Sequence, residues 1–536
     1  MRGYRRPAAA LTGLALCAAL AGCGVAPPAP TSAPSPTAVS DEGFALREIY
    51  GRWYEETTLE VLPRADYGAI YPYLGGVVPR EWPAARNVTL YGFATADGRI
   101  ICDPAFSDVA AYETDGGLVY AARRDTAHVT AEGSAGYRTE YASEDMSYVT
   151  WLIAGDGSFA TAYDEVEDAG GGYFSVRRDG LWGVVDASGA EVLARSYQYP
   201  PYYGEGLFVV TPAGAPGENA SLLYYYVDMD GERVIGEAAV FLSANMDVYG
   251  VEPARLFLRQ LVFSRGRAVS YGADGSYGYI DTSGALVIPR DYVTFYDYAE
   301  PFYADGRVVA RIYTEGGVSE NALIGTDGRE IIPRGAYLIF PTKDLYCVSE
   351  YPARRYVDAD GREVASYPET GGSGYLGDGW FAVENTVNGE RVLEISEDGA
   401  VRFTVPESAD YGLPTVTRLE DGTFVSLLGT YNSASLRVLD ASGAELYSFT
   451  RDAQLETITP DGLLRFSKSE PTAGGGGYAY YAGITAPDGT ETLPVAYLYL
   501  TRFGAYYTGQ RGYYGGLLDA NGDWVVKVSL LDGMDD

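Results

Sequence analysis

The sequence predicts an all-β protein, built as a repeat array of antiparallel β-hairpins. A short pattern recurs along the chain: an aromatic residue and a glycine open a strand, an Asp-x-x-Gly turn ends it, and an apolar pair follows. The 67 glycines are spread along the chain, as many tight turns require. Beyond the N-terminal segment, helical periodicity is nearly absent, whereas β-branched and aromatic runs are frequent.

The first 22 residues are typical of a secretion signal. Three arginines precede an apolar run over residues 8–19, which is short for a membrane span of about 20 residues. The segment ends in the sequence LAGC at residues 20–23, which resembles the lipobox of bacterial lipoproteins. This resemblance implies that Cys23 is lipidated and becomes the mature N-terminus. The alternative is that Cys23 is an ordinary residue of a secretory signal.

Residues 23–40 follow as a segment rich in Pro, Ala, Ser and Thr. This composition predicts an extended tether rather than a folded segment. Residues 41–87, which include Trp53 and Trp82, are expected to form an N-terminal cap or a degenerate repeat. A tether behind a lipid anchor places the folded part outside the cytoplasm, held at the bacterial cell membrane through Cys23.

The charge of the chain limits its partners. The net charge is −34, and removal of residues 1–22 with their three arginines makes it −37. So acidic a protein repels nucleic acid and anionic headgroups at long range, which argues against a phosphate-binding role. We expect no nucleic-acid partner, and we expect the charge to serve mainly solubility.

Turn glycines mark the repeats at a mean spacing of about 42 residues, the length of a four-stranded propeller blade. Asp186 and Asp281 each lie three residues before such a glycine, where a carboxylate can accept backbone N–H bonds within the turn. Other copies have an acid directly before the glycine, as in Asp230-Gly231. The eleven glycines are Gly98, Gly157, Gly189, Gly231, Gly284, Gly328, Gly361, Gly399, Gly443, Gly489 and Gly522.

This unit resembles the WG-repeat family. The matching pairs are Trp182-Gly183, Tyr277-Gly278, Tyr91-Gly92 and Tyr514-Gly515, each followed by the Asp/Gly turn. Tyrosine replaces the family's tryptophan in all of these except Trp182. The resemblance extends over residues 88–530 and implies a structural repeat without catalytic residues. The residues assigned to repeat structure are Trp182, Gly183, Asp186, Gly189, Tyr277, Gly278, Asp281 and Gly284.

The sequence does not decide whether the first and last units of the array meet. Ordinary propellers have about four to eight blades, fewer than the eleven units counted here. The chain therefore forms either one or two propeller-like domains or an open β-superhelix. We expect blades, divided into residues 88–310 and 311–536.

No catalytic or metal-binding constellation is visible, so we expect no enzyme activity, cofactor or metal. The single histidine, His128, lies in an alternating strand pattern, which leaves no two-histidine zinc site. The GxGxxG match at residues 372–377 is followed by another strand pattern instead of the helix that a dinucleotide site needs. The acidic stretches from Asp228 and from Asp358 contain only half of a calcium loop and are read as hairpin turns.

Tyrosine is the compositional outlier, with 48 residues in the chain. Adjacent tyrosines on a strand point to opposite faces, so each cluster is expected to expose at least one ring. Exposed tyrosines suit sugar stacking or protein contact. The candidates for ligand stacking are Tyr202, Tyr203, Tyr480, Tyr481, Tyr513 and Tyr514. Whether Cys102 and Cys347 form a disulfide or remain buried thiols is not decided by their spacing.

We therefore expect a non-catalytic, lipid-anchored surface protein whose WG-like repeats form a binding or scaffolding surface for a protein or an envelope polymer. The alternative is an envelope glycan-binding protein or a carbohydrate-active enzyme that uses tyrosine platforms and a pair among the 73 acidic residues.

Overall fold

The computed structural model describes most of the chain beyond residue 67. The described ranges are 68–78, 88–125, 129–130, 138–139, 148–214, 221–241, 253–272, 276–293, 299–313, 319–368, 373–409, 411–430, 433–459, 461–471 and 478–530. Cys23, Trp53, Trp82 and His128 lie outside them, as do the predicted signal and tether. Within these ranges, no helix is both long and apolar enough to cross a membrane.

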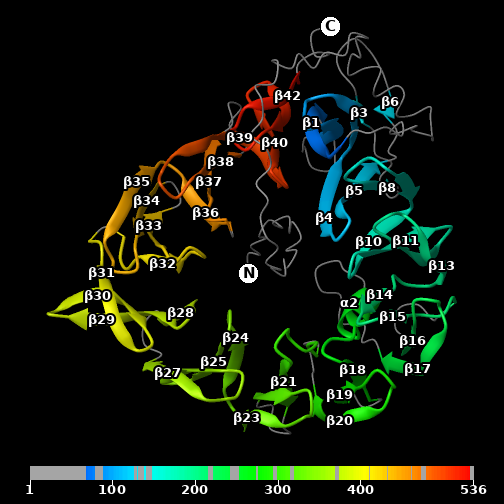
Figure 1. Ribbon diagram of the computed structural model, residues 1–536, viewed down its shortest axis with the longest axis horizontal. Coiled ribbons are helices and arrows are strands. Elements are labelled where there is room, and N and C mark those ends of the chain that lie inside the picture. The colour runs from blue at the N-terminus through cyan, green and yellow to red at the C-terminus, as the bar shows by residue number, and fades with distance from the viewer. Residues whose placement is uncertain are drawn as a thin grey trace, which may run out of the picture. The chain divides into compact units, whose positions relative to one another are not determined.

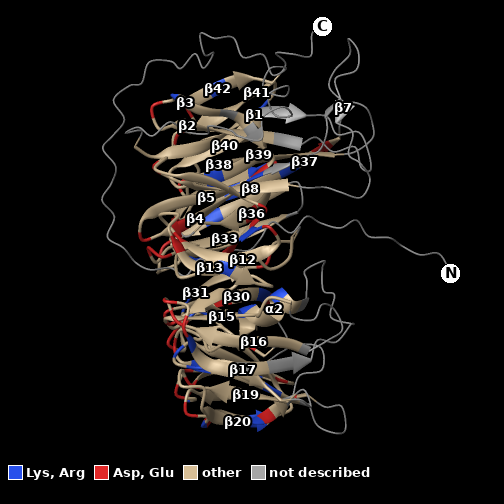
Figure 2. Ribbon diagram, turned by 90° about the vertical axis from the view of Figure 1, so that its right-hand side faces the viewer, with Lys and Arg blue, Asp and Glu red and all other residues tan. Residues whose placement is uncertain are grey.

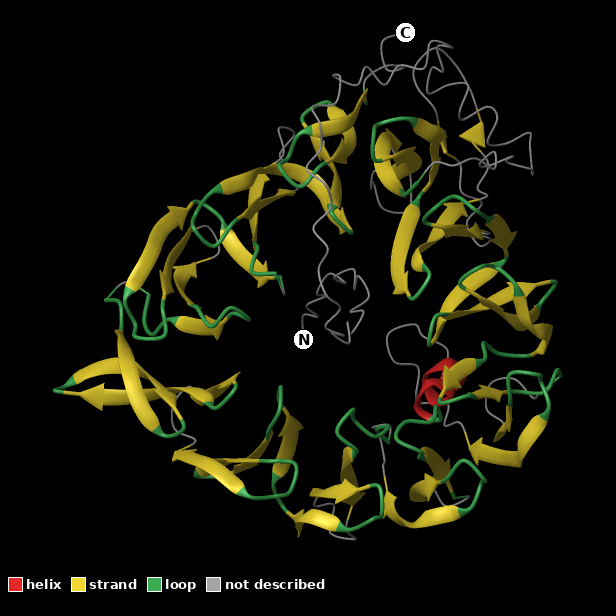
Figure 3. Cartoon of the chain, viewed as in Figure 1, coloured by secondary structure: helices red, strands yellow, loops and turns green. Residues whose placement is uncertain are grey.

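Almost all of the described chain is antiparallel β-structure, as predicted (Figure 3). Nine sheets have three or four strands, and a tenth has seven. In the seven-stranded sheet, the long strand β39 (Glu491–Phe503) pairs with β38 through its first half and with β40 through its second. We count this sheet as two units, which gives units 1 to 11 in chain order over the described residues (Figure 1).

The strands of the first six units have the following bounds. Unit 1 contains β1 (Ile70–Val78), β2 (Val88–Thr95) and β3 (Ile100–Phe106); unit 2 contains β4 (Asp108–Thr114), β5 (Gly117–Asp125), β8 (Tyr148–Ala154) and β9 (Ala160–Tyr163). Unit 3 contains β10 (Glu165–Gly170), β11 (Tyr173–Arg178), β12 (Leu181–Asp186) and β13 (Glu191–Tyr197); unit 4 contains β14 (Tyr202–Gly204), β15 (Leu207–Val210), β16 (Ser221–Val227) and β17 (Arg233–Phe241). Unit 5 contains β18 (Ala268–Tyr271), β19 (Ser276–Ile280) and β20 (Leu286–Val293); unit 6 contains β21 (Arg307–Tyr313), β22 (Ser319–Gly325) and β23 (Glu330–Gly335).

The remaining units follow the same order. Unit 7 contains β24 (Leu338–Pro341), β25 (Tyr346–Glu350), β26 (Ala353–Val357) and β27 (Glu363–Pro368); unit 8 contains β28 (Ser373–Gly377), β29 (Trp380–Val387), β30 (Glu390–Glu397) and β31 (Ala400–Pro406). Unit 9 contains β32 (Thr415–Arg418), β33 (Phe424–Thr430), β34 (Ser433–Leu439) and β35 (Glu445–Arg451). Units 10 and 11 contain β36 (Gln454–Ile458), β37 (Leu464–Pro471), β38 (Tyr478–Thr485), β39, β40 (Tyr506–Arg511), β41 (Tyr514–Leu518) and β42 (Trp524–Ser529). A separate hairpin pairs β6 (Val129–Thr130) with β7 (Arg138–Thr139).

The eleven predicted turn glycines each close the hairpin between the last two strands of one unit. All of them lie at positive φ, between 72° and 88°, a conformation that favours glycine. The predicted aspartate caps are also present: Asp281 Oδ1 accepts hydrogen bonds from the N–H groups of Ser283 and Ala285, at 2.9 and 3.1 Å. The turn chemistry read from the sequence is therefore confirmed at these positions.

The two Asp-x-Asp-Gly stretches are hairpin turns of the repeat, as predicted. In both turns the cap is the first acid, because Asp228 accepts from the N–H groups of Asp230 and Glu232, and Asp358 accepts from those of Asp360 and Arg362. The acid next to the glycine is not the capping residue in these two turns.

The glycine of the aromatic-Gly pair is explained by a close backbone approach. At Gly183 the ladder between β12 and β13 skips a residue, and a Cβ there would lie 2.6 Å from the carbonyl oxygen of Leu193. The same skip occurs at Gly278, where a Cβ would lie 2.3 Å from the carbonyl oxygen of Ile288. Such a bulge bends the outer strand, and a side chain has no room inside it.

The last unit corrects the sequence alignment of the repeat. Leu517 pairs with Val526 as Val184 pairs with Leu193, so Gly516 occupies the position of Gly183. A Cβ on Gly516 would lie 1.9 Å from the carbonyl oxygen of Val526. The sequence pair Tyr514-Gly515 therefore does not match Trp182-Gly183 in three dimensions, because it lies one residue out of register.

The hydrophobic core lies between successive sheets. Trp182 of unit 3 packs with Phe208 and Val227 of unit 4, and Val309 of unit 6 packs with Ile339 of unit 7. Hydrogen bonds add to this packing: the hydroxyl oxygen of Tyr277 accepts from the N–H of Arg311 in the next unit, at 3.0 Å. The aromatic residues of the repeat therefore join neighbouring units as well as filling their own.

The array closes on itself. Strand β1 contacts β40, β41 and β42, and Tyr73 and Ala94 of unit 1 share a buried cluster with Leu517 and Val526 of unit 11. Packing is also continuous near residue 310, since Tyr279 of unit 5 and Ala310 of unit 6 lie in one buried cluster. The array is therefore closed and propeller-like, and the division into residues 88–310 and 311–536 stays a prediction.

One helix, α2 (Pro253–Gln260), interrupts the described β-structure between units 4 and 5. Its apolar face is buried, with Ala254, Phe257 and Leu258 in the cluster that also holds Tyr224 and Tyr226. An all-β array was predicted from the sequence, and this helix was not predicted.

Candidate functional site

The acidic turns gather along one side of the described units, as Figure 2 shows by the red segments along one edge. This arrangement follows from the topology. In an antiparallel meander the connections alternate between the two ends of the strands, so the Asp-Gly turns of all units fall at the same end. We call this end the turn side. In the four-stranded units, the connections between the second and third strands lie at the other end.

Two predicted stacking residues, Tyr202 and Tyr203, lie in unit 4. Tyr202 is buried, and its hydroxyl donates a hydrogen bond of 2.5 Å to Oε2 of Glu167. Burial, together with the charge of Glu167, raises the pKa of Tyr202. Tyr203 is half-buried and packs against Tyr173 and Phe208. Both rings contribute to packing between units 3 and 4.

An ion cluster surrounds Tyr202. Helix α2 brings Arg255 to Glu165 and Glu167 on β10, with 2.5 Å between the Arg255 Nη1 and Glu165 Oε1 atoms, and Arg259 lies 3.1 Å from Glu167. Arg177 adds a third guanidinium, 3.2 Å from Glu165 Oε2. The Arg255 guanidinium also lies over the ring of Trp182, 5.2 Å from its centroid.

The two glutamates are the closest match to the paired carboxylates of the carbohydrate-enzyme alternative. A glycosidase acid must be able to give a proton to the leaving group, whereas these carboxylates are held as ion-pair acceptors by three arginines. These ion pairs hold helix α2 against unit 3.

The other predicted stacking residues lie in units 10 and 11. Tyr480 on β38 and Tyr513 in the turn before β41 are 69% and 66% exposed, and Tyr514 is also exposed. Tyr481 is half-buried because it points to the opposite face of β38 from Tyr480. Three of these four candidates therefore present their rings to solvent.

The structure adds Tyr478 and Tyr499 to this group. Tyr478 lies two residues before Tyr480 on the same face of β38, and Tyr499 lies on β39, which both units share. Both are exposed. We define the tyrosine patch as Tyr478, Tyr480, Tyr499, Tyr513 and Tyr514. The clusters of neighbouring tyrosines in the sequence predicted part of this group. Tyr499 belongs to no such cluster, so it was not predicted.

All members of the tyrosine patch lie at the end of the strands away from the turn side. Tyr478 begins β38, whereas the turn at Gly489 follows the other end of that strand. Tyr513 lies in the β40–β41 turn, and β41 then runs toward the turn at Gly522. The patch therefore faces away from the row of acidic turns.

Contacts through β39 connect the two halves of the patch. Ala482, two residues after Tyr480, pairs with Tyr497, and the guanidinium of Arg511 lies over the Tyr497 ring at 5.7 Å from its centroid. Arg511 is two residues before Tyr513. The exposed rings of units 10 and 11 therefore lie on strands that β39 connects.

Two local features shape this surface. Tyr499 has a φ of 56°, an unusual conformation for a bulky residue, which holds its ring at the junction between the two units. Lys527 lies 4.1 Å from the ring centroid of Tyr514 and supplies a positive charge beside it. Rigid tyrosine rings with polar edges are well suited to recognition, because they offer contact area at a small entropic cost.

The remaining sequence candidates have structural positions. Trp182 and Tyr277 are buried, and their neighbours Gly183 and Gly278 lie in the bulges described above. Cys102 on β3 and Cys347 on β25 are buried in separate clusters. Across the part of the chain that the structure describes, no group of three or more His, Cys, Asp or Glu side chains is placed to hold a metal ion.

Comparison with known proteins identifies one repeat. Residues 277–313 match the family model of the WG containing repeat, which spans β19, β20 and β21 of units 5 and 6. A comparison with curated protein sequences gave no match.

Among solved structures, BamB from Moraxella catarrhalis is 16% identical over 65% of this chain and 99% of its own, with a TM-score of 0.26. The computationally designed Ika8 protein is 13% identical over 63% of this chain and 98% of its own, with a TM-score of 0.26. TolB from Acinetobacter baumannii is 13% identical over 60% of this chain and 76% of its own, with a TM-score of 0.22. The chain thus contains a WG containing repeat, set in a closed array of antiparallel sheets.

Proposed function

We propose that this chain is a non-catalytic surface protein, anchored through lipidated Cys23, whose WG-like repeats present a binding face to a protein or an envelope polymer. The tyrosine patch carries the proposal. Its five exposed rings lie on two adjacent units, although most repeat tyrosines elsewhere fill the core. A group of exposed aromatic side chains is typical of an interaction site.

The recurring residues of the repeat support a scaffolding role for the chain. The turn aspartates, the turn glycines and the aromatic-Gly pairs each have a structural role in the hairpins or between units. The charged pair that resembles an enzyme site is neutralised by arginines. These observations favour recognition over catalysis.

A binding assay with the full chain tests the proposal. The wild type and the double variant Tyr480→Ala/Tyr513→Ala are each incubated with insoluble envelope glycan, and the bound fraction is measured. If the partner is the polymer, we expect the double variant to lose most of the binding. Tyr351→Ala is the matched control, because Tyr351 is 80% exposed but lies in unit 7.

A protein partner gives a different result in the same design. The glycan then binds none of the proteins, whereas cross-linking in intact cells yields an adduct with the wild type and Tyr351→Ala but not with the double variant. Equal behaviour of all three proteins in both assays would contradict a binding role for the patch.

Replacement of Cys23 tests the anchor separately. The Cys23→Ser variant should move from the membrane fraction to the soluble fraction, because the lipid attachment site is lost. If the variant stays with the membrane, the lipoprotein assignment is wrong.

A further inference from the structure

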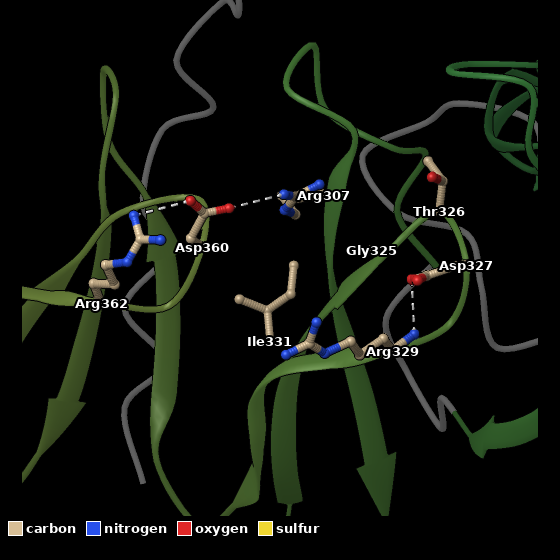
Figure 4. Close-up of a pocket in the computed structure, with 8 residues that line it drawn as sticks. All are labelled: Arg307, Gly325, Thr326, Asp327, Arg329, Ile331, Asp360 and Arg362. Carbon is tan, nitrogen blue, oxygen red and sulfur yellow. Dashed lines mark hydrogen bonds and ion pairs between the residues drawn. The ribbon is translucent and has the colours of Figure 1, made fainter.

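A polar cleft lies on the turn side, between the turns of units 6 and 7 (Figure 4). Its volume is 430 Å³, which is large enough for a small ligand. The lining includes three arginines and two aspartates, with Ile331 as an apolar wall; the charged residues are Arg307, Asp327, Arg329, Asp360 and Arg362. No sequence motif pointed to this site.

The repeat itself brings these arginines together. Arg329 and Arg362 each follow a turn glycine directly, and the same position holds an arginine in only one other turn, at Arg99. Units 6 and 7 are thus the only consecutive units of the array with arginine at this position. Because successive turns lie side by side at the turn side, the two guanidinium groups line the same cleft.

Arg307 is fixed between the two units. Its Nε atom donates a hydrogen bond of 2.7 Å to the carbonyl oxygen of Ala359 in the unit 7 turn, and its Nη1 atom donates to the carbonyl oxygen of Gly306. Arg267 makes the equivalent bond to Thr326 one unit earlier, also at 2.7 Å. Arg307 therefore links unit 6 to the turn of unit 7, as Arg267 links unit 5 to unit 6, and it also contributes a positive charge to the cleft.

The other two arginines differ in their partners. Arg362 lies 3.1 Å from Asp360 and 3.8 Å from Asp358, and the Asp360 carboxylate also lies 3.8 Å from Arg307. Asp327 accepts its hydrogen bond from the backbone N–H of Arg329, not from the guanidinium. Among the described acids, none forms an ion pair with the exposed Arg329 guanidinium, so this group is available to an incoming anion.

The local charge is therefore much less negative than that of the whole molecule. Three guanidinium groups face two carboxylates in the lining, and Asp358 beside Arg362 adds a third, so that the charges nearly balance, although the chain carries a net charge of −34. At physiological salt, charges farther away than about 8 Å are largely screened, so the nearest groups decide what the cleft attracts. Guanidinium forks match the geometry of a carboxylate, which they bind in a bidentate manner.

We propose that this cleft binds a carboxylate group on a small polar carbon skeleton, such as that of an acidic sugar. Arg329 and Arg362 contact the carboxylate, and Ile331 contacts the carbon skeleton. The carboxylate belongs either to a free acid or to a residue of an acidic glycan. The cleft lies on the turn side and the tyrosine patch at the other end of the strands, so the two sites are separate and each is tested without the other.

Calorimetric titration of the full chain with three sugars tests the proposal. D-galacturonate and D-galactose differ at C6, where galacturonate carries a carboxylate, and a galacturonate trimer represents the glycan. We expect saturable binding of galacturonate and none of galactose. Binding of the trimer at least as tight as that of the monomer assigns the glycan as the source, whereas a trimer that fails to bind assigns the free acid.

Substitutions locate the binding. Arg329→Gln/Arg362→Gln should weaken galacturonate binding by about a hundredfold, because each of the two charged contacts contributes about one decade of affinity. Arg99→Gln removes an arginine from the equivalent turn of unit 1 and should leave the affinity unchanged. If the double variant melts below the wild type, Arg329→Gln alone takes its place, since the exposed Arg329 guanidinium forms no ion pair with the described acids.

Two results would overturn the proposal. One is the absence of saturable galacturonate binding, or equal binding of galactose. The other is an equal loss of affinity in Arg99→Gln and in the cleft variants.

Discussion

Single glycines determine how closely the strands of this protein approach one another. Gly183 and Gly278 fill ladder bulges in which a carbonyl oxygen of the next strand lies where a Cβ would be. The aromatic residue before each glycine is buried. The recurring aromatic-Gly pair is therefore a packing requirement of the hairpin and needs no ligand to explain it.

Substitution of Gly278 tests this explanation. Gly278→Ala should lower the free energy of unfolding by about 2 kcal/mol or more, because the new Cβ would force the backbone of β20 to move. Gly374→Ala is the control, since a Cβ on Gly374 has no neighbour within 4 Å. Chemical denaturation measures both, and equal effects of the two substitutions would refute the close-approach argument.

The turn aspartates predict a dependence of stability on pH. Hydrogen bonds from the Ser283 hydroxyl and from backbone N–H groups lower the pKa of Asp281 below its ordinary value of 3.8, and the equivalent bonds act on Asp440. A carboxylate with a lowered pKa in the folded state stabilises the protein above its unfolded pKa, and this stabilisation is lost as the pH falls through the folded value.

Thermal unfolding of Asp281→Ala measures this effect. At pH 7 the variant should melt at a lower temperature than the wild type, and the difference should shrink as the pH falls below about 4. A difference that stays constant down to pH 3 would show that the charge of Asp281 does not contribute.

The residue scale is also where the sequence predicted most. All eleven turn glycines were found from spacing, because a hairpin turn depends on local chemistry that four residues carry. The match at Gly515 was wrong by one residue, because it followed the Tyr-Gly residue types; counted back from the turn glycine, Gly516 precedes Gly522 at the same spacing as Gly183 precedes Gly189, in agreement with the pairing of β41 with β42. Tyr499 and Arg329 gained their significance only from neighbours that are distant in the sequence.

At the scale of elements, helix α2 joins units that are not adjacent in the sequence. It lies between units 4 and 5, yet its arginines pair with glutamates of unit 3. Eight residues give little more than two helical turns, too few for the 3.6-residue period to stand out in the sequence. Its stability therefore comes from the buried face and the ion cluster, which no local pattern could show.

Removal of Arg255 should be costly. Arg255→Met leaves Glu165 and Glu167, both mostly buried, without their main cation, and we expect a loss of about 2 kcal/mol in the free energy of unfolding. Arg391→Met removes an exposed arginine that also pairs with two glutamates, and it should cost clearly less than Arg255→Met, because solvent screens exposed ion pairs. Similar losses of unfolding free energy in both variants would contradict the role of these ion pairs in holding α2 against unit 3.

At the scale of the whole molecule, the sequence left closure open between propeller-like and superhelical forms. Closure rests on contacts such as that of Gly515 with Leu74, where a Cβ would lie 2.5 Å from the Leu74 carbonyl oxygen. Residues so far apart in the sequence leave no periodic signal. The repeat count of eleven was accessible from spacing, whereas the contact between the first and last units was not.

Gly515→Ala should weaken this closure. We expect faster amide hydrogen exchange in β1 and β41, because the two strands must move apart to admit the new side chain. Gly236→Ala, at a site with no neighbour within 4 Å of the added Cβ, should leave exchange in these strands unchanged. Unchanged exchange in Gly515→Ala as well would indicate that the contact does not hold the ends together.

In the proposed function, a partner covers the tyrosine patch. Photo-crosslinking in intact cells tests this, with a photoreactive phenylalanine analogue placed at position 480, 513 or 351 of the full chain. We expect a cross-linked adduct from positions 480 and 513 and none from position 351. Adducts of equal yield from all three positions, or from position 351 alone, would contradict it.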